Sequence, residues 1–356
     1  MTQFTATVVT SYSVEGAHVG KKLGTVALFL GAFLLALAAL SKFYMYDQLA
    51  VVPQNTKTTS ISATAPGADA EYLDIAAGLK VTNGPLKSTR IVVGNVKESK
   101  QASKDLGHDI AVWDTFSCTD KPAFDCGSGD TPLSGTTDKV AFDRNTGETV
   151  NWDGARSESG GVKTRGSFAG HYFKFPFDTQ KKTYKFWDGT LREATDAKYV
   201  GEGTVKGLKV YKFTQTIEPT KTGTLAVPGT LVGVTDKPTV VADRFYSNVR
   251  SFSVEPVTGV IIVGGESQDG YLALDGERKL TTTKAVLQYT DKNTADTVDT
   301  YKTKATLLSA VKTTVPLVAG ILGILLLAIG VWTRRGGQAD AAGSRRSESP
   351  EVDPKK

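Results

Sequence analysis

Two uncharged apolar runs, at residues 23–40 and 315–332, dominate the pattern of hydrophobic and polar positions along this chain. About 270 mostly polar residues lie between them. Each run has about 18 residues, which at ~1.5 Å per residue gives roughly 27 Å of helix, close to the hydrocarbon thickness of a bilayer. The pattern therefore predicts two transmembrane α-helices.

The basic residues beside these runs predict how the chain is oriented. Lys21 and Lys22 precede the first run, and Arg334 and Arg335 follow the second. Because Lys and Arg concentrate on the cytoplasmic side of a membrane, we expect both termini to be cytoplasmic and the middle of the chain to lie outside the cell membrane. The predicted parts are a cytoplasmic tail (1–22), a transmembrane helix (23–42), an extracytoplasmic β-rich domain (43–313), a second transmembrane helix (314–333) and a disordered cytoplasmic tail (334–356).

The first run also fits a signal peptide, because a basic pair, an apolar stretch and small residues follow one another there. We favour an anchor, since the run continues without a polar residue to Leu40, and Phe43 and Tyr44 follow where an aromatic belt would meet the headgroups. Whether this run is cleaved from the mature protein is left open. Small residues four apart, such as Ala319 and Gly323, would let a helix approach a neighbour closely.

The region between the runs is predicted to be mainly β. Hydrophobic and polar residues alternate at 208–217 and 285–289, and β-branched residues fill 260–263. Residues 143–147 and 255–259 each combine an acidic residue with a glycine four positions later, as a tight turn requires. These features predict one large antiparallel β domain, for which a curved half-barrel is one possible form.

Few segments of this region suggest anything other than strands and turns. None has a clear helical period, and residues 73–79 form at most a short helix. The stretch at 56–70, rich in Thr, Ser, Ala and Pro, is interpreted as a stalk or an edge strand.

The two cysteines indicate the cellular compartment of the middle region, and the distribution of charge excludes one class of binding partner. Cys118 and Cys126, the only two cysteines, lie eight residues apart and are expected to form a disulfide, as in an oxidising compartment. Two thiols without a nearby histidine make an incomplete zinc site, and their spacing is not that of a redox Cys-x-x-Cys motif. The tails 1–22 and 333–356 hold 8 of the 42 basic and 5 of the 37 acidic residues, which leaves a nearly neutral middle. Nucleic acid is therefore excluded as a partner.

The densest aromatic cluster is the candidate lipid-binding site. It contains Phe173, Phe175, Phe177, Phe186 and Trp187. On an alternating strand the first three would share one face, with Tyr172 and Lys174 on the other. Ordinary core packing is the favoured interpretation of any one ring, but an aromatic concave face also suits acyl chains.

Catalytic chemistry has little support in the sequence. The three histidines, His18, His108 and His171, are scattered, and no Gly-x-Ser-x-Gly elbow or phosphate-binding loop occurs. Residues 143–147 lack the glycine and glutamate positions of a calcium loop. Asp114 and Asp188, each directly after a tryptophan, are the nearest to sugar-site acids, although turns explain them equally well. We therefore expect no enzyme, no cofactor and no metal site.

Three groups of phrases resemble the actinobacterial PorA-like family of unknown function. They are AFDRNTGE at 141–148, YFKFPFDT at 172–179 with YKFWD at 184–188, and YVGEGTVKGL at 199–208. The resemblance covers nearly the whole chain and implies an envelope protein connected with lipoglycan and envelope lipids. The order of turns and strands from 201 to 259 is similar, as a pattern only, to the LolA-like and LppX-like lipid carriers, which are half-barrels with an apolar concavity.

Three classes of function follow from these features. The favoured class is a non-catalytic envelope protein whose outer domain binds a membrane lipid or lipoglycan precursor and supports its transport or assembly. The alternatives are a scaffold with a solid core that holds envelope-synthesis membrane proteins, and an enzyme acting on glycan or lipid. The porin label of the family is not carried over, because two helices cannot line an aqueous pore unless they oligomerise.

Overall fold

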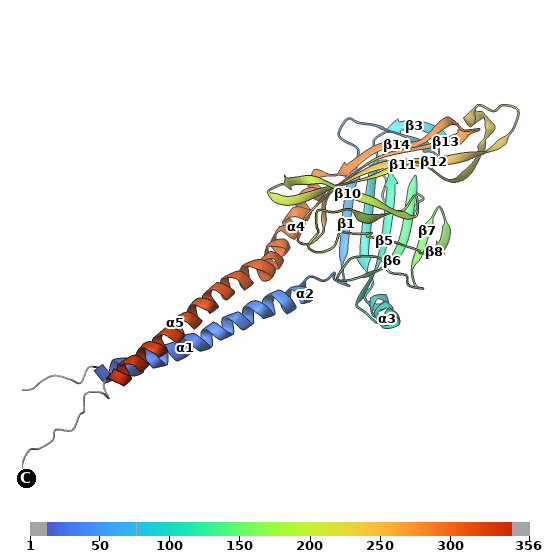
Figure 1. The fold of residues 1–356 in the computed structure, drawn as a ribbon. Helices are drawn as coiled ribbons and strands as arrows, with labels where there is room; N and C mark the ends of the chain where they lie inside the picture. Colours follow the sequence, from blue (N-terminus) through green and yellow to red (C-terminus); the bar gives the residue numbers. More distant parts are fainter. Residues whose placement is uncertain (1–12, 76, 344–356) are drawn as a thin grey trace, which may run out of the picture. The chain divides into compact units, whose positions relative to one another are not determined.

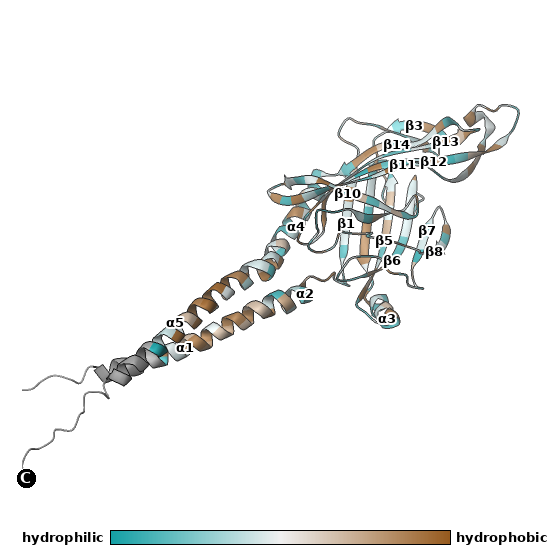
Figure 2. Ribbon diagram, in the orientation of Figure 1, coloured by the Kyte–Doolittle hydropathy of each residue, from teal (hydrophilic) through white to brown (hydrophobic). Residues whose placement is uncertain are grey.

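The computed structural model describes residues 13–75 and 77–343 (Figure 1). The chain divides into two compact units, one made of Met1–Leu49 with Leu307–Lys356 and the other of Ala50–Thr306. Figure 2 shows that the apolar residues of the first unit are spread along its two long helices. The two units are described separately below as the helical unit and the β unit.

The helical unit contains both apolar runs. Its elements are α1 (Ser13–Leu40), η1 (Ser41–Met45), α2 (Tyr46–Leu49), the end of α4 (Asp291–Ser309), η3 (Ala310–Thr314) and α5 (Val315–Gly343). Lys22–Leu49 and Asp291–Arg335 are long and apolar enough to cross a membrane. Helix α5 continues past the predicted boundary at residue 333, and residues 1–12 and 344–356 of the two predicted tails lie outside the described residues.

Glycines set the contact between the two long helices. A Cβ on Gly31 would lie 2.8 Å from the carbonyl oxygen of Gly323, and a Cβ on Gly330 would lie 2.8 Å from that of Gly24. These pairs are seven residues apart on each helix, so they repeat along one face of an antiparallel pair. Of these glycines, the spacing of small residues in the sequence pointed to Gly323. Beyond this contact, Ser41 donates a hydrogen bond of 2.8 Å to the carbonyl of Val311.

The β unit is built on one antiparallel sheet of 14 strands. The strands are β1 (Lys57–Ala63), β2 (Ala70–Asp74), β3 (Lys80–Gly84), β4 (Lys87–Gly94), β5 (Ile110–Asp120), β6 (Ser134–Asp143), β7 (Arg156–Ser159), β8 (Val162–Arg165), β9 (Tyr184–Asp188), β10 (Glu193–Val205), β11 (Leu208–Pro228), β12 (Thr239–Val254), β13 (Ile261–Leu274) and β14 (Glu277–Tyr289). Their order is β8-β7-β6-β5-β4-β1-β14-β13-β12-β11-β10-β9, with β2 and β3 to one side. The sheet curls into a half-barrel, which confirms the predicted fold class.

Short bridges continue the hydrogen bonding between the two ends of the curl. Phe142 of β6 pairs with Thr149, Glu148 pairs with His171, and His171 pairs with Phe186 of β9. The peptide N–H of Trp187 also donates to the carbonyl of His171 at 2.8 Å. These bridges therefore connect β6 to β9, and the segment around His171 enters the interior of the sheet.

Three predictions about this unit are wrong. Helix α3 (Val96–Leu106) and most of α4 were not expected, and residues 73 and 74, the start of the short helix considered at 73–79, belong to strand β2. The boundary signals of α3 were present, because Asn95 accepts a bond from the N–H of Glu98 and Gly107 ends the helix at φ 74°. The segment at 57–63 is neither stalk nor edge, since β1 lies between β4 and β14.

The predicted disulfide and both predicted turns are present. Cys118 and Cys126 are bonded, with Cα atoms 5.9 Å apart. The carboxylate of Glu255 accepts bonds from the N–H groups of Val257 and Thr258, so it caps the turn between β12 and β13. Gly259 closes this turn at φ 72°, where a Cβ would lie 2.1 Å from the carbonyl oxygen of Phe175. The turn thus holds the segment that fills the interior.

Candidate functional site

The interior of the curled sheet is filled at one end by residues 170–179, called here the inner segment. The segment is irregular and not a strand. The N–H of Phe175 donates to the carbonyl of Gly259 at 2.8 Å, and that of Asp178 donates to Val257 at 3.0 Å. Pro176 has no N–H to give to a neighbouring strand, and Asp178 adopts φ 53°. The prediction of an alternating strand here is therefore wrong.

The inner segment directs its phenylalanines to opposite walls. Phe173 and Phe177 pack against a cluster that includes Trp113 and Phe142. Phe175 belongs to a different cluster, with Phe186, Phe213 and Phe252 among its members. The expectation that Phe173, Phe175 and Phe177 share one face is wrong, because the irregular backbone turns Phe175 toward the other half of the sheet.

The five predicted site residues are parts of the packed interior. The Phe175 ring is 0% exposed and lies 4.6 Å from Phe213 and 5.2 Å from Phe186, centroid to centroid. Trp187 lies in a third cluster, where its ring is 5.3 Å from Phe168. The described residues form two surface depressions of about 460 and 300 Å³, each lined mainly by polar and charged side chains. Neither is an enclosed apolar cavity for acyl chains.

Beyond the aromatic end, the same face of the sheet is lined by hydroxyl groups. Two rows of cross-strand neighbours run across β1, β4, β5 and β6. They are Ser62, Ser88, Thr119 and Ser134 in one row and Ser60, Arg90, Ser117 and Thr136 in the next. They occupy the same strand face as Trp113, because residues two apart on a strand point the same way. Most are half-buried, so part of the row reaches solvent.

A buried charge network joins this wall to the opposite one. The hydroxyl of Tyr172 donates to Asp138 at 2.5 Å, and Arg90 lies 3.5 Å from that hydroxyl. Burial lowers the pKa of Arg90, but its electrostatic interactions with Tyr172, Tyr289, Asp138 and Glu266 outweigh this and raise it. Arg90 therefore stays charged. Burial also raises the pKa of Tyr172, so its hydroxyl keeps its proton.

The second wall supplies the remaining members of the network. Arg250 donates to the side-chain oxygen of Gln215 at 3.1 Å and lies 3.8 Å from the carboxylate of Asp188. The amide of Asn248 donates to the hydroxyl of Tyr246 at 2.8 Å and to Glu266 at 3.3 Å. The other amide atom, Asn248 Oδ1, is buried without a hydrogen-bond partner among the described residues. The interior thus has an apolar end and a polar, hydrogen-bonding end.

Two buried basic side chains lie at the aromatic end. Burial lowers the pKa of Lys174 to about 7, although the charge of Glu255 raises it. The Lys174 ammonium lies 3.7 Å from the centroid of the Phe177 ring, and within the described residues it has no hydrogen-bond partner. Burial lowers the pKa of His171 to about 4, so this imidazole is neutral at pH 7.

The acids that were the nearest candidates for catalysis lie apart and have structural partners. Asp114 accepts a bond from the Asn95 amide at 3.0 Å and lies 3.8 Å from Lys139. Asp188 caps a turn by accepting from the N–H groups of Thr190 and Leu191 at 2.9 Å. No group of three or more His, Cys, Asp or Glu side chains in the described part of the chain is arranged to hold a metal ion.

Comparison with known proteins identifies the family of this chain. A family model described as Porin PorA matches residues 23–332. The chain belongs to this family. The resemblance inferred from residues 141–148, 172–188 and 199–208 is therefore confirmed.

Two curated relatives, both named Porin PorA, come from Corynebacterium amycolatum and Corynebacterium resistens. The first is 29% identical over 203 residues, which cover 45% of this chain and 53% of the relative. The second is 27% identical over 226 residues, which cover 46% of this chain and 55% of the relative. The chain spans about half the length of the curated relatives it matches.

Sequence reasoning missed the polar end of the interior. The signal was the alternation of Ser and Thr with other residues in TTSIS at 58–62 and DTFSCT at 114–119. Hydroxyl residues are common on exposed strand faces, so this alternation did not indicate an inner face. Only the register of the neighbouring strands brings the hydroxyls into rows.

Proposed function

We propose that this chain is a non-catalytic, membrane-anchored envelope protein whose β unit binds the hydroxyl-rich head group of an envelope glycolipid or lipoglycan precursor. The observation that carries the proposal is the row of hydroxyls beside Arg90 on the inner face, opposite Glu266 and Arg250. Sugar hydroxyls both donate and accept hydrogen bonds, so they match a wall of Ser and Thr hydroxyls with fixed charges. The packing of the aromatic end is a second argument for a polar ligand, because the inner segment occupies the space that acyl chains would need.

The proposed topology follows from the same two helices. Residues 23–42 and 314–333 would cross the membrane, with both termini in the cytoplasm and residues 43–313 outside. The basic residues beside both runs support this orientation. The Cys118–Cys126 disulfide supports an oxidising compartment for the β unit.

A binding experiment on the full chain tests the proposal. The protein would be purified in detergent, mixed with a glycolipid extract of the envelope, and analysed by native mass spectrometry. The double variant Glu266→Gln/Gln268→Leu changes the inner face, because both positions lie on β13 beside Arg250 and Asn248. Glu218→Gln, an exposed acid on β11, is the matched control.

We expect the wild-type chain and the control to retain a glycosylated lipid and the double variant to lose most of it. Retention of the same lipid by the double variant would refute the inner face as the site. A wild-type chain that retains no glycosylated lipid would favour the scaffold, in which the filled interior serves only stability.

The name of the family favours a second function, a pore formed by an oligomer. Both apolar runs lack charged residues, so helices alone would give a dry lumen, and the polar end of the β unit would have to supply the lining. The inner segment would narrow such a path. Recordings of the full chain in planar bilayers test this function: discrete conductance steps would support a pore, and silent bilayers at saturating protein would count against it.

A further inference from the structure

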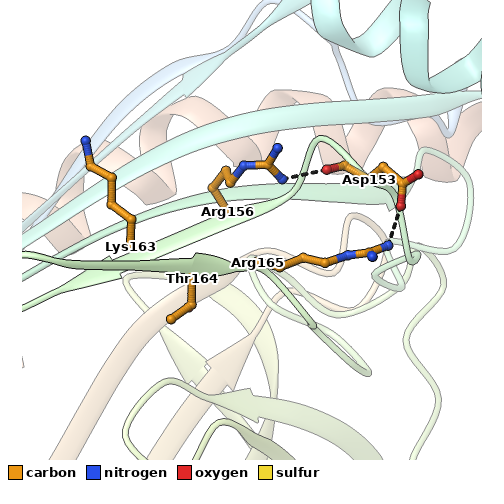
Figure 3. A pocket seen from close by; sticks show the side chains of 5 residues that line it. All are labelled: Asp153, Arg156, Lys163, Thr164 and Arg165. Atoms are coloured by element: carbon orange, nitrogen blue, oxygen red, sulfur yellow. Dashed lines mark hydrogen bonds and ion pairs between the residues drawn. The ribbon is translucent and has the colours of Figure 1, made fainter.

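The β7–β8 hairpin carries a basic surface depression (Figure 3). The depression has a volume of about 460 Å³ and is lined by Asp153, Arg156, Lys163, Thr164 and Arg165. Strand β8 pairs only with β7, so this hairpin ends the sheet. The depression is separate from the interior, where Ser157 of β7 donates to Asp138.

Two arginines of the depression oppose each other directly. Arg156 of β7 pairs in register with Arg165 of β8, and Glu158 pairs with Lys163. Directly opposite residues of an antiparallel pair lie on the same face, so both guanidinium groups leave the hairpin on one side. Like charges in this position destabilise a sheet. An anion between the two groups would remove that cost.

One acidic residue already contacts both arginines, through different groups. The backbone carbonyl of Asp153 accepts a bond of 2.5 Å from Arg156, and its carboxylate accepts a bond from Arg165. Arg156 is held a second time by the carbonyl of Ala155, at 2.7 Å. The Asp153 side chain is 91% exposed, so solvent or a ligand can replace it. The depression therefore presents one oriented guanidinium and one whose partner can exchange.

We propose that this depression binds an external oxyanion, a phosphate or carboxylate group, between Arg156 and Arg165. Lys163 adds a positive charge at the rim, where its ammonium lies 3.6 Å from the Glu158 carboxylate. Guanidinium groups bind carboxylate and phosphate through two parallel hydrogen bonds, and a lysine adds a point charge. In this arrangement the Asp153 carboxylate is a competitor that occupies Arg165 until the ligand arrives. Charged side chains on an edge strand also prevent sheets from joining, but that role predicts no saturable anion binding.

Phosphorus NMR of inorganic phosphate tests the proposal on the full chain held in phosphatidylcholine nanodiscs. Line broadening would be followed as phosphate is titrated against each protein. The variants are Arg156→Gln/Arg165→Gln, Asp153→Asn and the control Lys198→Gln. Lys198 is an exposed lysine that lines the other surface depression, so its removal changes net charge without touching the hairpin. Circular dichroism establishes that each variant is folded.

We expect saturable binding to the wild-type chain, weakened about tenfold or more by the double arginine variant, since hydrogen bonds to charged groups are strong. Asp153→Asn should bind several-fold more tightly and Lys198→Gln unchanged. Binding by the double variant within twofold of wild type, the lack of saturation, or an unchanged affinity of Asp153→Asn would each overturn the proposal. Vesicles added to the phosphate complex then identify the source of the anion. Displacement of phosphate by vesicles of phosphatidylinositol in phosphatidylcholine, but not by vesicles of phosphatidylcholine alone, indicates a lipid head group. No displacement by either indicates a soluble anion.

Discussion

Lys174 makes the free energy of unfolding depend on pH in a way that can be worked out from its position. Its ammonium is buried, and burial lowers the pKa from 10.5 to about 7. In the unfolded chain the lysine holds its proton up to about its ordinary pKa. Between pH 7 and 10.5 the unfolded state therefore binds one more proton than the folded state. Stability must rise with pH across this window.

The size of the effect follows from the same shift. The free energy of unfolding should increase by about 1.4 kcal/mol per pH unit within the window. Below pH 7 the full penalty of the buried charge is present, and above pH 10.5 it has vanished. A shift of about 3.5 units corresponds to about 5 kcal/mol, which is an upper bound because the surroundings relax.

The substitution Lys174→Met removes the charge and keeps an apolar side chain of comparable length. It also removes the contact of the ammonium with the Phe177 ring, a loss of about 1 to 2 kcal/mol. We expect the variant to be more stable than wild type by about 2 to 3 kcal/mol at pH 7. The difference should shrink as the pH rises to 9, because the wild-type lysine is then largely neutral.

Urea unfolding of the full chain in nanodiscs, followed by tryptophan fluorescence at pH 7, 8 and 9, measures the slope. His171 has a pKa of about 4 in the fold and 6.5 ordinarily, so it adds only a small slope near pH 7, in the same direction, and almost none at pH 8 and 9. Lys80→Met, at an exposed lysine on β3, is the control and should leave the slope as in wild type. A flat wild-type profile, or a Lys174→Met variant less stable at pH 7, would refute the assignment of the buried charge.

Three further predictions concern packing. Phe175→Ala should lower the free energy of unfolding by about 3 to 5 kcal/mol, because a fully buried ring leaves a cavity; a loss below 1 kcal/mol in urea titrations would show that the ring is not core. Gly31→Leu should destabilise the helix pair by at least about 1 to 3 kcal/mol, since its Cβ would lie 2.8 Å from the Gly323 carbonyl. The control is Gly320→Leu, which should have little effect because a Cβ at Gly320 would meet no atom within 4 Å. Equal melting temperatures of the two variants in detergent would contradict the close contact between Gly31 and Gly323. Cys118→Ser/Cys126→Ser should cost about 2 to 3 kcal/mol yet fold, as circular dichroism can check.

Local rules were sufficient for the two apolar helices, several strands and both tight turns. Charge-free length predicted both apolar helices, and alternation predicted the strands at 208–217 and 285–289. The turn at 255–259 followed from one acid and one glycine, because the carboxylate satisfies the backbone within the turn itself. These features depend on residues that are close together in the sequence, so a single sequence was enough to predict them.

The site depends on contacts across the sheet, so sequence could not place it. Phe175 and Phe173 are two residues apart and would share a face on any regular strand, yet hydrogen bonds to the distant turn at 255–259 divide them between two walls. Arg90 and Glu266 interact although 176 positions separate them in the chain. Helix α3 was missed because its polar sequence, VKESKQASKDL, has too few apolar residues for a clear period.

The division of the interior into two ends determines which ligands the half-barrel can hold. An apolar concavity gains its affinity for acyl chains from area that is dry and empty before the ligand arrives. Here Phe173, Phe175 and Phe177 already cover that area, and moving them out would expose rings that now pack at centroid distances of about 5 Å. On β1, β4, β5 and β6 the inner face carries Ser and Thr side chains beside Arg90, so a ligand there gains most by hydrogen bonding. This division of the interior is the reason that the proposed ligand is a polar head group and not an acyl chain.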